Sequence, residues 1–325
     1  MLFARALDYW ETIWKFPKLS CIRVGKTRFF YNKNHDQVVR DYYLYTVELL
    51  REAAAGIDLH ADIVVGNYRV RGANREHYRK LDFQIEHTLV KPGGRGSAGA
   101  PSGCIPIPSM PGINYLVRIQ DLDRLASADG LIEYSKPNLI NIKTSRIHSE
   151  VVEKTCLVAP LVFPLGANFS DTGRDLEVIT LFGNTEEPRR KSLLEKLKQA
   201  NSNSQNISGH FGDVRSIYRR TKILVNVRQT DHHDTLEELR VLPALQSGVI
   251  VISEDVPLRN EIPYSEFIIW GALEDIPSLV ESVHENYDKY FNSIFKNEKL
   301  HKCFKRISIE NKENAVDLIR SMKNS

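Results

Sequence analysis

Apolar and polar positions alternate in two different rhythms along this chain. Over residues 35–54 the apolar side chains recur three and four positions apart, which predicts an amphipathic helix that ends near Gly56. Short apolar runs follow, separated by polar or helix-like stretches at residues 120–127 and 146–154. Strands that alternate with helices indicate a mainly parallel α/β arrangement. The runs that we predict as strands are residues 61–65, 83–90, 113–119, 139–143 and 155–163.

The polar, turn-rich residues 164–175 interrupt this pattern, and a second α/β pattern begins after them. Residues 249–253 are almost wholly apolar, which is typical of a strand covered on both faces. The chain is therefore expected to be an α/β protein with two Rossmann-like domains that face a central cleft, over residues 1–165 and 176–325. In the second domain we predict strands at 176–182, 206–210, 222–228 and 249–253, and helices at 188–200, 213–220, 236–246 and 276–295, with a helical tail.

Composition narrows the class of protein. With 42% hydrophobic and 26% charged residues, the 325-residue chain can form real cores. Its 44 basic and 41 acidic residues leave a net charge of +3, which gives no general reason to expect a nucleic acid partner. No window approaches ~18 uninterrupted apolar residues, charges interrupt residues 1–16, and the four cysteines lie far apart. We therefore expect a cytoplasmic protein without a disulfide framework or a zinc site.

Two segments leave open a contact with the inner face of a membrane. Residues 1–16 place apolar and aromatic side chains along one helical face, which packs against the first domain or forms a peripheral membrane foot. Residues 296–306 carry five basic residues and one acidic residue. Such a run is a solvated helix face, or it attracts anionic lipid or a polyanionic acceptor.

A glycine-rich segment follows the strand predicted over residues 83–90. It contains a literal GxGxxG at Gly94, Gly96 and Gly99, but the prolines after it prevent the helix that a dinucleotide fingerprint requires. A flexible loop over a cleft is the better interpretation. Glu86 and His87 stand just before it, where a carboxylate or an imidazole could take a proton from an acceptor hydroxyl. The alternative is that both only bind loop amides.

The second domain has a sharper pattern around residues 222–253. A strand runs into a polar loop, and Asp234 or Thr235 is a candidate N-cap for the helix that follows. The start of a helix suits a diphosphate, and a carboxylate there, Glu237, could accept hydrogen bonds from a ribose diol. Arg240, one turn later, could bind phosphate or Glu237. Alternatively, Glu237 and Arg240 form only a solvated ion pair.

The stretch LEELRVLPALQSGVIVISED, after ILVNVRQTDHHD, resembles the donor-binding half of GT-B glycosyltransferases, and the resemblance covers residues 176–255. It implies that Glu237 binds the ribose of a nucleotide-sugar donor, and that Arg228 and the following loop, with His233, meet the diphosphate. The strand end at Gly183 and Asn184, followed by basic residues, resembles the first strand of that half. By the same resemblance, Arg189 or Lys191 offsets phosphate charge, and the turn containing His210 lies near the nucleobase.

The sequence also departs from that family. Retaining members have two glutamates seven or eight residues apart, whereas Gln229 and Thr230 stand at the positions before Glu237. The tandem His232-His233 is unusual, and because adjacent side chains diverge, we do not expect the two to bind one metal ion. The resemblance implies no metal and no other cofactor, and the departures leave the stereochemistry open.

The function expected from these features is metal-independent sugar transfer, from a nucleotide-sugar to a hydroxyl of a glycan or a lipid-linked acceptor in glycan or polysaccharide biosynthesis. The C-terminal domain would bind the donor and the N-terminal domain the acceptor, with Glu86 or His87 as the catalytic base if the reaction inverts. One alternative is a non-catalytic protein that binds a sugar or a nucleotide. A second is nucleic-acid binding through the basic residues of 69–80, which we rank last because the chain lacks known RNA-binding motifs.

Overall fold

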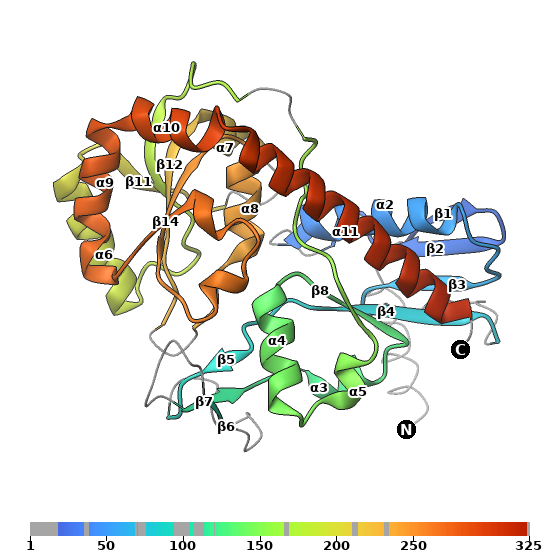
Figure 1. Ribbon diagram of the computed structural model, residues 1–325. Coiled ribbons are helices and arrows are strands. Elements are labelled where there is room, and N and C mark those ends of the chain that lie inside the picture. The colour runs from blue at the N-terminus through green and yellow to red at the C-terminus, as the bar shows by residue number, and fades with distance from the viewer. Residues whose placement is uncertain are drawn as a thin grey trace, which may run out of the picture.

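The structure is a computed structural model that describes residues 19–35, 39–68, 70, 76–93, 104–106, 114–119, 121–165, 169–209, 214–230 and 234–323. Over these residues the chain forms two α/β domains, each built on its own mainly parallel sheet, and a long helix runs from one to the other (Figure 1). The expected α/β fold class is confirmed. The helix expected over residues 1–16 lies outside the described residues. None of the helices in the described ranges is long and apolar enough to cross a bilayer.

The N-terminal domain is built on a six-stranded sheet whose strands lie side by side in chain order. The first two strands form an antiparallel hairpin, and each later pair is parallel. Because the described strands advance in one direction, their order does not reverse within this sheet. The strands are β1 (Ser20–Val24), β2 (Thr27–Tyr31), β3 (Asp62–Val65), β4 (Tyr78–Gln84), β8 (Gly130–Glu133) and β9 (Thr155–Leu157).

Helices cover both faces of this sheet. The helix predicted over residues 35–54 is present as α2 (Arg40–Ala54), and it buries its apolar stripe against one face. The short helices α3 (Leu122–Ala126) and α5 (Ser149–Val152) lie on the other side with α4 (Lys136–Ser145) (Figure 1). A small antiparallel sheet is inserted between β4 and β8, with the order β5-β7-β6. Its strands are β5 (Leu89–Val90), β6 (Cys104–Pro106) and β7 (Asn114–Val117).

Two strand predictions in this domain fail for local reasons. Residues 139–143 are not a strand, because they lie in helix α4 (Lys136–Ser145). The Ser135 hydroxyl accepts a hydrogen bond from the Asn138 N–H at 3.3 Å, and Pro137 stands in the first turn, so the segment carries a complete helix start. The strand predicted over 83–90 is divided between β4 and β5. The loop between these two strands carries Glu86 and His87.

The C-terminal domain contains five parallel strands in the order β11-β10-β12-β13-β14. From β10 the chain moves outward to β11 and then returns to the other side of β10, so the order reverses between β10 and β12. Helices α6 (Pro188–Ala200) and α9 (Ile276–Glu285) lie on one side of the sheet and α8 (Glu238–Gln246) on the other (Figure 1). The strands are β10 (Leu176–Thr180), β11 (Ser204–Asn206), β12 (Thr221–Asn226), β13 (Ile250–Glu254) and β14 (Ile268–Gly271), and α7 (Val214–Arg220) precedes β12.

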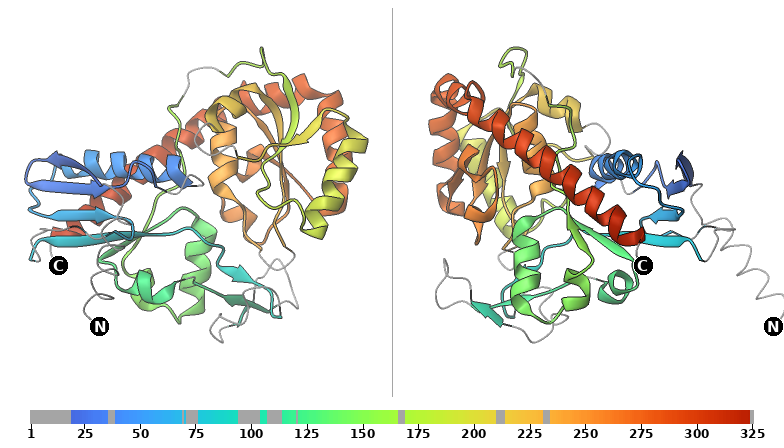
Figure 2. Two further views of the ribbon diagram at one scale, coloured as in Figure 1. Left: turned by 180° about the vertical axis from the view of Figure 1, so that it is seen from behind. Right: turned by 45° about the vertical axis from the view of Figure 1, so that its right-hand side comes forward.

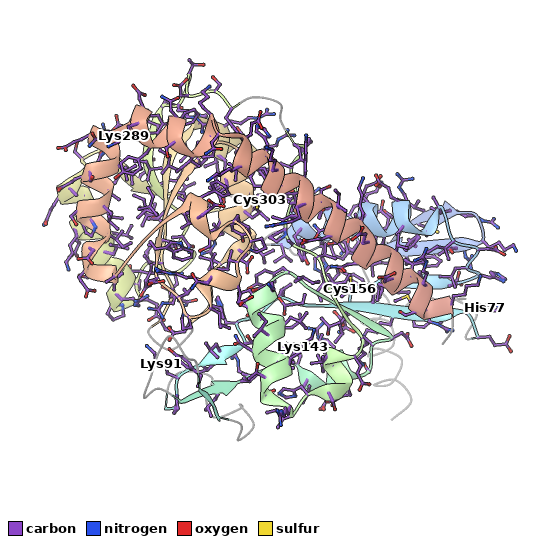
Figure 3. The ribbon with its side chains drawn as sticks, viewed as in Figure 1. His77, Lys91, Lys143, Cys156, Lys289 and Cys303 are labelled. Carbon is purple, nitrogen blue, oxygen red and sulfur yellow. The ribbon has the colours of Figure 1, made fainter. Side chains whose placement is uncertain are left out.

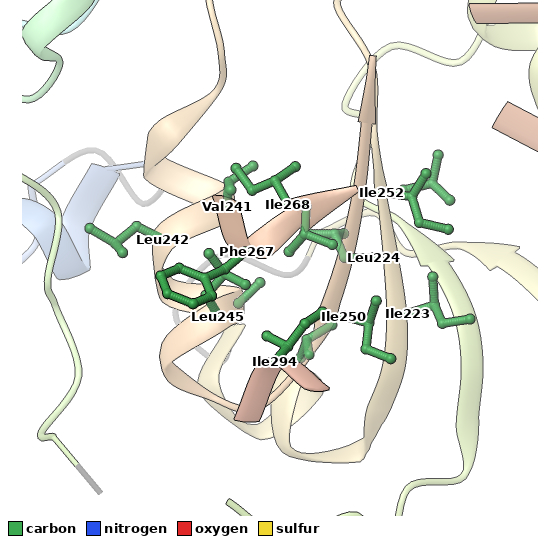
Figure 4. Packing of buried hydrophobic residues seen from close by; sticks show 14 of the residues in the cluster. Ile223, Leu224, Val241, Leu242, Leu245, Ile250, Ile252, Phe267, Ile268 and Ile294 are labelled. Atoms are coloured by element: carbon green, nitrogen blue, oxygen red, sulfur yellow. The ribbon is translucent and has the colours of Figure 1, made fainter. Parts of the chain in front are cut away.

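Apolar strands fix the core of this domain. Every residue of β13 is buried, as expected for a strand with helices on both faces. The parallel register places Leu224 of β12 on one face of the sheet and Ile250 and Ile252 of β13 on the other. Ile252 and Ile223 lie on the side away from α8, whose Val241, Leu242 and Leu245 cover the opposite face (Figure 4). The packed sheet holds the ends of β10, β12 and β13 at one edge, where the candidate site residues lie.

The two domains share one helix. Helix α10 (Tyr287–Phe295) leads into α11 (Glu298–Lys323), whose first half contributes Phe304 and Ile307 to the second core. Its last turns cover the first sheet, where Leu318 and Met322 leave so little room that a β-carbon on Gly130 would lie within 3 Å of both (Figure 2). Cys156 of β9 lies beside this part of α11 (Figure 3). The division at 165 and 176 remains a prediction, since the end of α11 completes the first core.

Candidate active site

The candidate residues gather where the order of the second sheet reverses. In open α/β sheets the crevice outside the carboxyl ends of the strands, at such a reversal, is the usual ligand site. Here the carboxyl ends of β10 and β12 meet the first turns of α6 and α8. The first domain faces this edge with the loop between β4 and β5 and with the small sheet.

His87 and Glu237 meet across the two domains. Glu237 immediately precedes α8, and its Oε1 lies 2.9 Å from Nε2 of His87, 150 positions earlier in the chain. The other ring nitrogen, Nδ1, is hydrogen-bonded to the Thr235 hydroxyl. The N-cap predicted at Asp234 or Thr235 is wrong, because the helix begins at Glu238 and no side chain caps it. Thr235 is buried, and its hydroxyl is hydrogen-bonded to the His87 imidazole and not to the start of the helix.

Two arginines keep Glu237 ionised. Burial by itself raises the pKa of Glu237, but Arg240, His87 and Arg190 together hold that pKa well below its usual range. Nη2 of Arg240 lies 4.0 Å from Oε2 of Glu237. Arg190 is only 2% exposed, and its guanidinium lies 4.4 Å from the centre of the Phe182 ring. Burial, with Arg240 adding like charge, lowers the pKa of Arg190 to about 10.

These two arginines have unused donors. Nε of Arg190 and Nη1 of Arg240 are buried, and neither forms a hydrogen bond within the described part of the chain. A buried N–H without a partner costs about 1–3 kcal/mol, and more in a charged group. Guanidinium donors are suited to phosphate oxygens. The arrangement can therefore bind an anion beside Glu237.

Glu254 forms a second, more complete ion-pair network at the same edge. Its carboxylate accepts hydrogen bonds from Arg189 at 2.6 and 3.0 Å, and from both the side chain and the backbone N–H of Arg228. Arg189 also donates to the Arg228 carbonyl at 2.8 Å. Burial raises the pKa of Glu254, but the hydrogen bonds from Arg189 and Arg228 outweigh it and lower that pKa to about 2. This network fixes the ends of β12 and β13 to the start of α6.

Asp234 links this network to the first domain. It is fully buried, and it pairs with Arg228 while accepting a hydrogen bond of 2.5 Å from the Tyr115 hydroxyl. Nζ of Lys91 lies 3.5 Å from the same carboxylate, and the Asp234 N–H donates to the Leu89 carbonyl at 3.2 Å. Lys91 stands beside β5, below the second domain (Figure 3). Asp234 thus joins the small sheet to the loop that carries Glu237.

A cavity of about 720 Å³ lies beside these residues. Lys91 lines it from the first domain, and Arg189, Arg228 and Glu254 line it from the second, with residues 255–261 and 272–274. Glu237, His87, Arg190 and Arg240 are not among the residues that line it, so the cavity adjoins the Glu254 network. The larger cavity, of about 900 Å³, lies between α4, β9 and α11 and contains none of the candidate residues.

Other predicted site residues lie apart from this centre. Gly183 and Asn184 follow β10 and are exposed. Lys191 is exposed on α6 and lies 3.5 Å from Glu186. Glu86 uses its backbone carbonyl to accept from Gln84 at 2.6 Å, and its carboxylate bonds to no other described residue. His210 and His233 lie outside the described residues, and so does the glycine-rich run at 94–100.

Several residues at the centre were not identified from the sequence. Arg190 stands between the two basic residues that were named, and only the phase of α6 shows which of the three is buried. Glu254 ends β13, so the carboxyl-end rule that selected Glu86 could have found it. Asp234 was considered only as a cap, and nothing marked Tyr115. Within the described ranges, no group of three or more His, Cys, Asp or Glu side chains is arranged to hold a metal ion.

Comparison with known proteins gives distant relatives. No protein-family model matches the chain. It is 33% identical over 116 residues to the uncharacterized protein R358 of Acanthamoeba polyphaga mimivirus, a match that covers 34% of this chain and 40% of that protein. The chain thus shares well under two thirds of the length of that relative.

Solved structures match most of the chain at low identity. A mutant of S. aureus TarM in complex with fondaparinux, α-GlcNAc-glycerol and UDP has a TM-score of 0.49 at 10% identity, covering 92% of this chain and 60% of that one. The GtfA/B complex has a TM-score of 0.43 at 11% identity, covering 94% of this chain and 63% of that one. CalG4, the calicheamicin glycosyltransferase, has a TM-score of 0.35 at 10% identity, covering 87% of this chain and 82% of that one. All three likenesses are distant, with TM-scores below 0.5.

Proposed function

We propose that this protein is a glycosyltransferase that moves a sugar from a nucleotide-sugar to a hydroxyl of a glycan or lipid-linked acceptor, without a metal ion. The observation that carries the proposal is the ionised Glu237, flanked by two arginines with unused buried donors and contacted by His87 from the other domain. Carboxylate, guanidinium and imidazole are the groups that a ribose, a diphosphate and an acceptor hydroxyl would need.

The donor would bind along the edge of the second sheet. Oε2 of Glu237 faces away from His87 and toward Arg240, so ribose hydroxyls could donate to it. The diphosphate would take the free N–H groups of Arg190 and Arg240. When the bond between the anomeric carbon and the diphosphate breaks, these fixed positive charges would stabilise the negative charge on the leaving group, the task that a metal ion performs elsewhere.

The proton transfer in this proposal uses one nitrogen of His87. An ionised carboxylate only accepts hydrogen bonds, so Nε2 of His87 carries the hydrogen that faces Glu237. Nδ1 then carries the lone pair, and the Thr235 hydroxyl donates to it. An acceptor hydroxyl in place of Thr235 would attack the anomeric carbon and give its proton to Nδ1. Glu237 would stabilise the resulting imidazolium, and Glu86 remains the second candidate base.

A thermal-shift screen against UDP, GDP, CMP and dTDP, with and without magnesium, tests the donor site. We expect one nucleotide to raise the Tm without magnesium, by linkage of binding to folding. The shift should shrink in Glu237→Gln and persist in the matched control Lys191→Gln. A nucleotide that binds while no sugar acceptor is ever modified would favour the non-catalytic alternative. If no nucleotide shifts the Tm at millimolar concentration, the assignment of Glu237 and its neighbours to a donor site is wrong.

A further inference from the structure

A second pair of carboxyl groups is buried where the first domain meets α8. Glu133 ends β8 and is 0% exposed, and Glu238 is the first residue of α8 and is 2% exposed. Neither takes part in any ion pair within the described part of the chain. Two ionised carboxylates buried together without a cation would be very costly, so at least one of them is expected to be neutral.

The hydrogen bonds around the pair leave room for a proton. Ser135 N–H and Asn138 Nδ2 donate to Oε1 of Glu133 at 2.9 and 3.1 Å, and the Tyr264 hydroxyl donates to Oε2 of Glu238 at 2.6 Å. The other oxygen of each carboxyl, Oε2 of Glu133 and Oε1 of Glu238, is buried and meets no donor in good geometry among the described residues. A carboxylic acid needs such a free oxygen to carry its hydrogen.

Burial is the main cause that raises the pKa of both groups. It takes the pKa of Glu238 to about 7, although hydrogen bonds from Ser135 and Tyr264 partly offset it. The pKa of Glu133 lies well above its usual range, and the negative charge of Glu238 adds to the effect of burial. The other titratable groups that interact with the pair or lie beside it are Glu237, Tyr42, Tyr134 and Tyr264, none of which is a cation.

The pair is connected to the candidate active site on both sides. Asn138, which binds Glu133, accepts a hydrogen bond from the Thr88 hydroxyl at 2.9 Å, and its Nδ2 lies 3.4 Å from the Glu86 carbonyl. Both neighbours of His87 in the chain are therefore held by Asn138. On the other side, Glu238 directly follows Glu237.

We propose that the Glu133–Glu238 pair retains a proton and acts as a positioning element that holds His87 opposite Glu237, an inference that rests on the proposed function for its effect on transfer. When the pair is neutral, Ser135 and Asn138 join α8 to the loop between β4 and β5. When Glu238 ionises, a negative charge without a cation is buried between the domains, next to the ionised Glu237 in the chain. The cost of burying that charge and its repulsion from Glu237 separate the two segments, and His87 loses its contact with Glu237.

Because glutamine mimics a neutral carboxyl, Glu238→Gln separates this proposal from a simple packing role. In the wild type, kcat/KM should fall about tenfold for each pH unit above about 7, as the protonated fraction falls. In Glu238→Gln this decline should disappear, and in the exposed control Glu310→Gln it should persist. A Glu238→Gln profile that matches the wild type would overturn the proposal.

Infrared spectroscopy tests the proton without any substrate. A neutral-carboxyl carbonyl band should titrate near pH 7 in the wild type and be missing from the same difference spectrum of Glu238→Gln. A wild type without such a band would overturn the proposal. If no transfer is found with any donor, the ring resonances of His87, identified by their loss in His87→Ala, should still differ at pH 8.5 between the wild type and Glu238→Gln. Identical resonances would overturn the proposal independently of the proposed function.

Discussion

Glu237 and Glu254 stand at the same edge of one sheet, and each faces two arginines. Glu254 is saturated, since Arg189 and Arg228 donate to both of its oxygens. Glu237 has one arginine at 4.0 Å and another whose charge acts on it. Among the described residues, Nη1 of Arg240, a terminal nitrogen, forms no hydrogen bond.

We interpret this difference as that between a structural ion-pair network, around Glu254, and the proposed ligand site, around Glu237. In the Glu254 network, the carboxylate accepts hydrogen bonds from terminal N–H groups of Arg189 and Arg228. No ligand is needed to supply acceptors for these groups. In the Glu237 network, the two arginines carry more positive charge than the single Glu237 carboxylate neutralises. An anionic ligand would supply the missing acceptors. Four changes test whether the two networks differ in this way.

The largest effect is expected on stability, from Glu254→Gln. The substitution leaves two largely buried guanidinium groups without their carboxylate, and breaking a buried ion pair from one side costs about 3–5 kcal/mol. Urea unfolding should show this loss. Glu274→Gln, exposed on the rim of the same cavity, is the matched control and should change stability by less than about 0.5 kcal/mol. Equal stability of the two variants would contradict the structural role.

Acid should act on the same network. Because folding lowers the pKa of Glu254 from 4.5 to about 2, its stabilisation is complete above pH 4.5 and is lost as the pH falls toward 2. The shift corresponds to about 3 kcal/mol. Unfolding free energies measured from pH 5 to pH 2 should fall more steeply in the wild type than in Glu254→Gln. Parallel curves would contradict this prediction.

A smaller effect, on binding, is expected from Arg240→Gln. The variant removes a charge that faces both Glu237 and the place assigned to the diphosphate, and a charge-assisted hydrogen bond contributes about 1.5–3 kcal/mol. Calorimetric titration with the nucleotide that gives the largest thermal shift should show a Kd about 10- to 100-fold weaker. Glu254→Gln, at a temperature where it is folded, should weaken binding less than Arg240→Gln does. The reverse order would exchange the roles of the two networks.

The smallest effect is expected from Lys191→Gln. Lys191 is exposed and pairs with an exposed glutamate at 3.5 Å, so its loss should change stability by less than about 1 kcal/mol. Nucleotide affinity should stay within about twofold of the wild type in the same titration. A larger loss of affinity would show that Lys191, and not Arg190, reaches the phosphate.

Periodicity predicted the longer elements of the second domain better than its short ones. The strand predicted over 206–210 meets β11 only at Asn206, and the helix predicted over 276–295 is divided into α9 and α10. Helix α6 has the predicted bounds, since Pro188 begins it and the apolar stripe ends at Leu197. The first domain was harder. Strand β8 has four residues, all buried, and such a short apolar run does not reveal its structure. The hairpin of β1 and β2 in the first domain was not predicted. Strand β14 of the second domain was not predicted either.

The site was predicted as separate residues and not as an arrangement. The sequence indicated His87 and Glu237 individually, but nothing local to either could show that residues 150 positions apart share a hydrogen bond. The adjacent Arg189 and Arg190 show a second limit. Neighbours on a helix point about 100° apart, so one pairs with Glu254 and the other lies beside Glu237. Only the packing of α6 decides which of the two arginines pairs with Glu254 and which lies beside Glu237.

Helix α11 has a consequence for how the protein is made. Ala315, Leu318, Ile319 and Met322 belong to the core of the N-terminal domain, yet they are synthesised after all the strands of the second sheet. During translation, the part of the first sheet beside α2 therefore stays uncovered until the second sheet has emerged from the ribosome. Domains in most chains fold in the order in which they are synthesised. Of these two domains the N-terminal one is made first and completed last, and a ribosome that stops before the last turns of α11 releases it with an incomplete core.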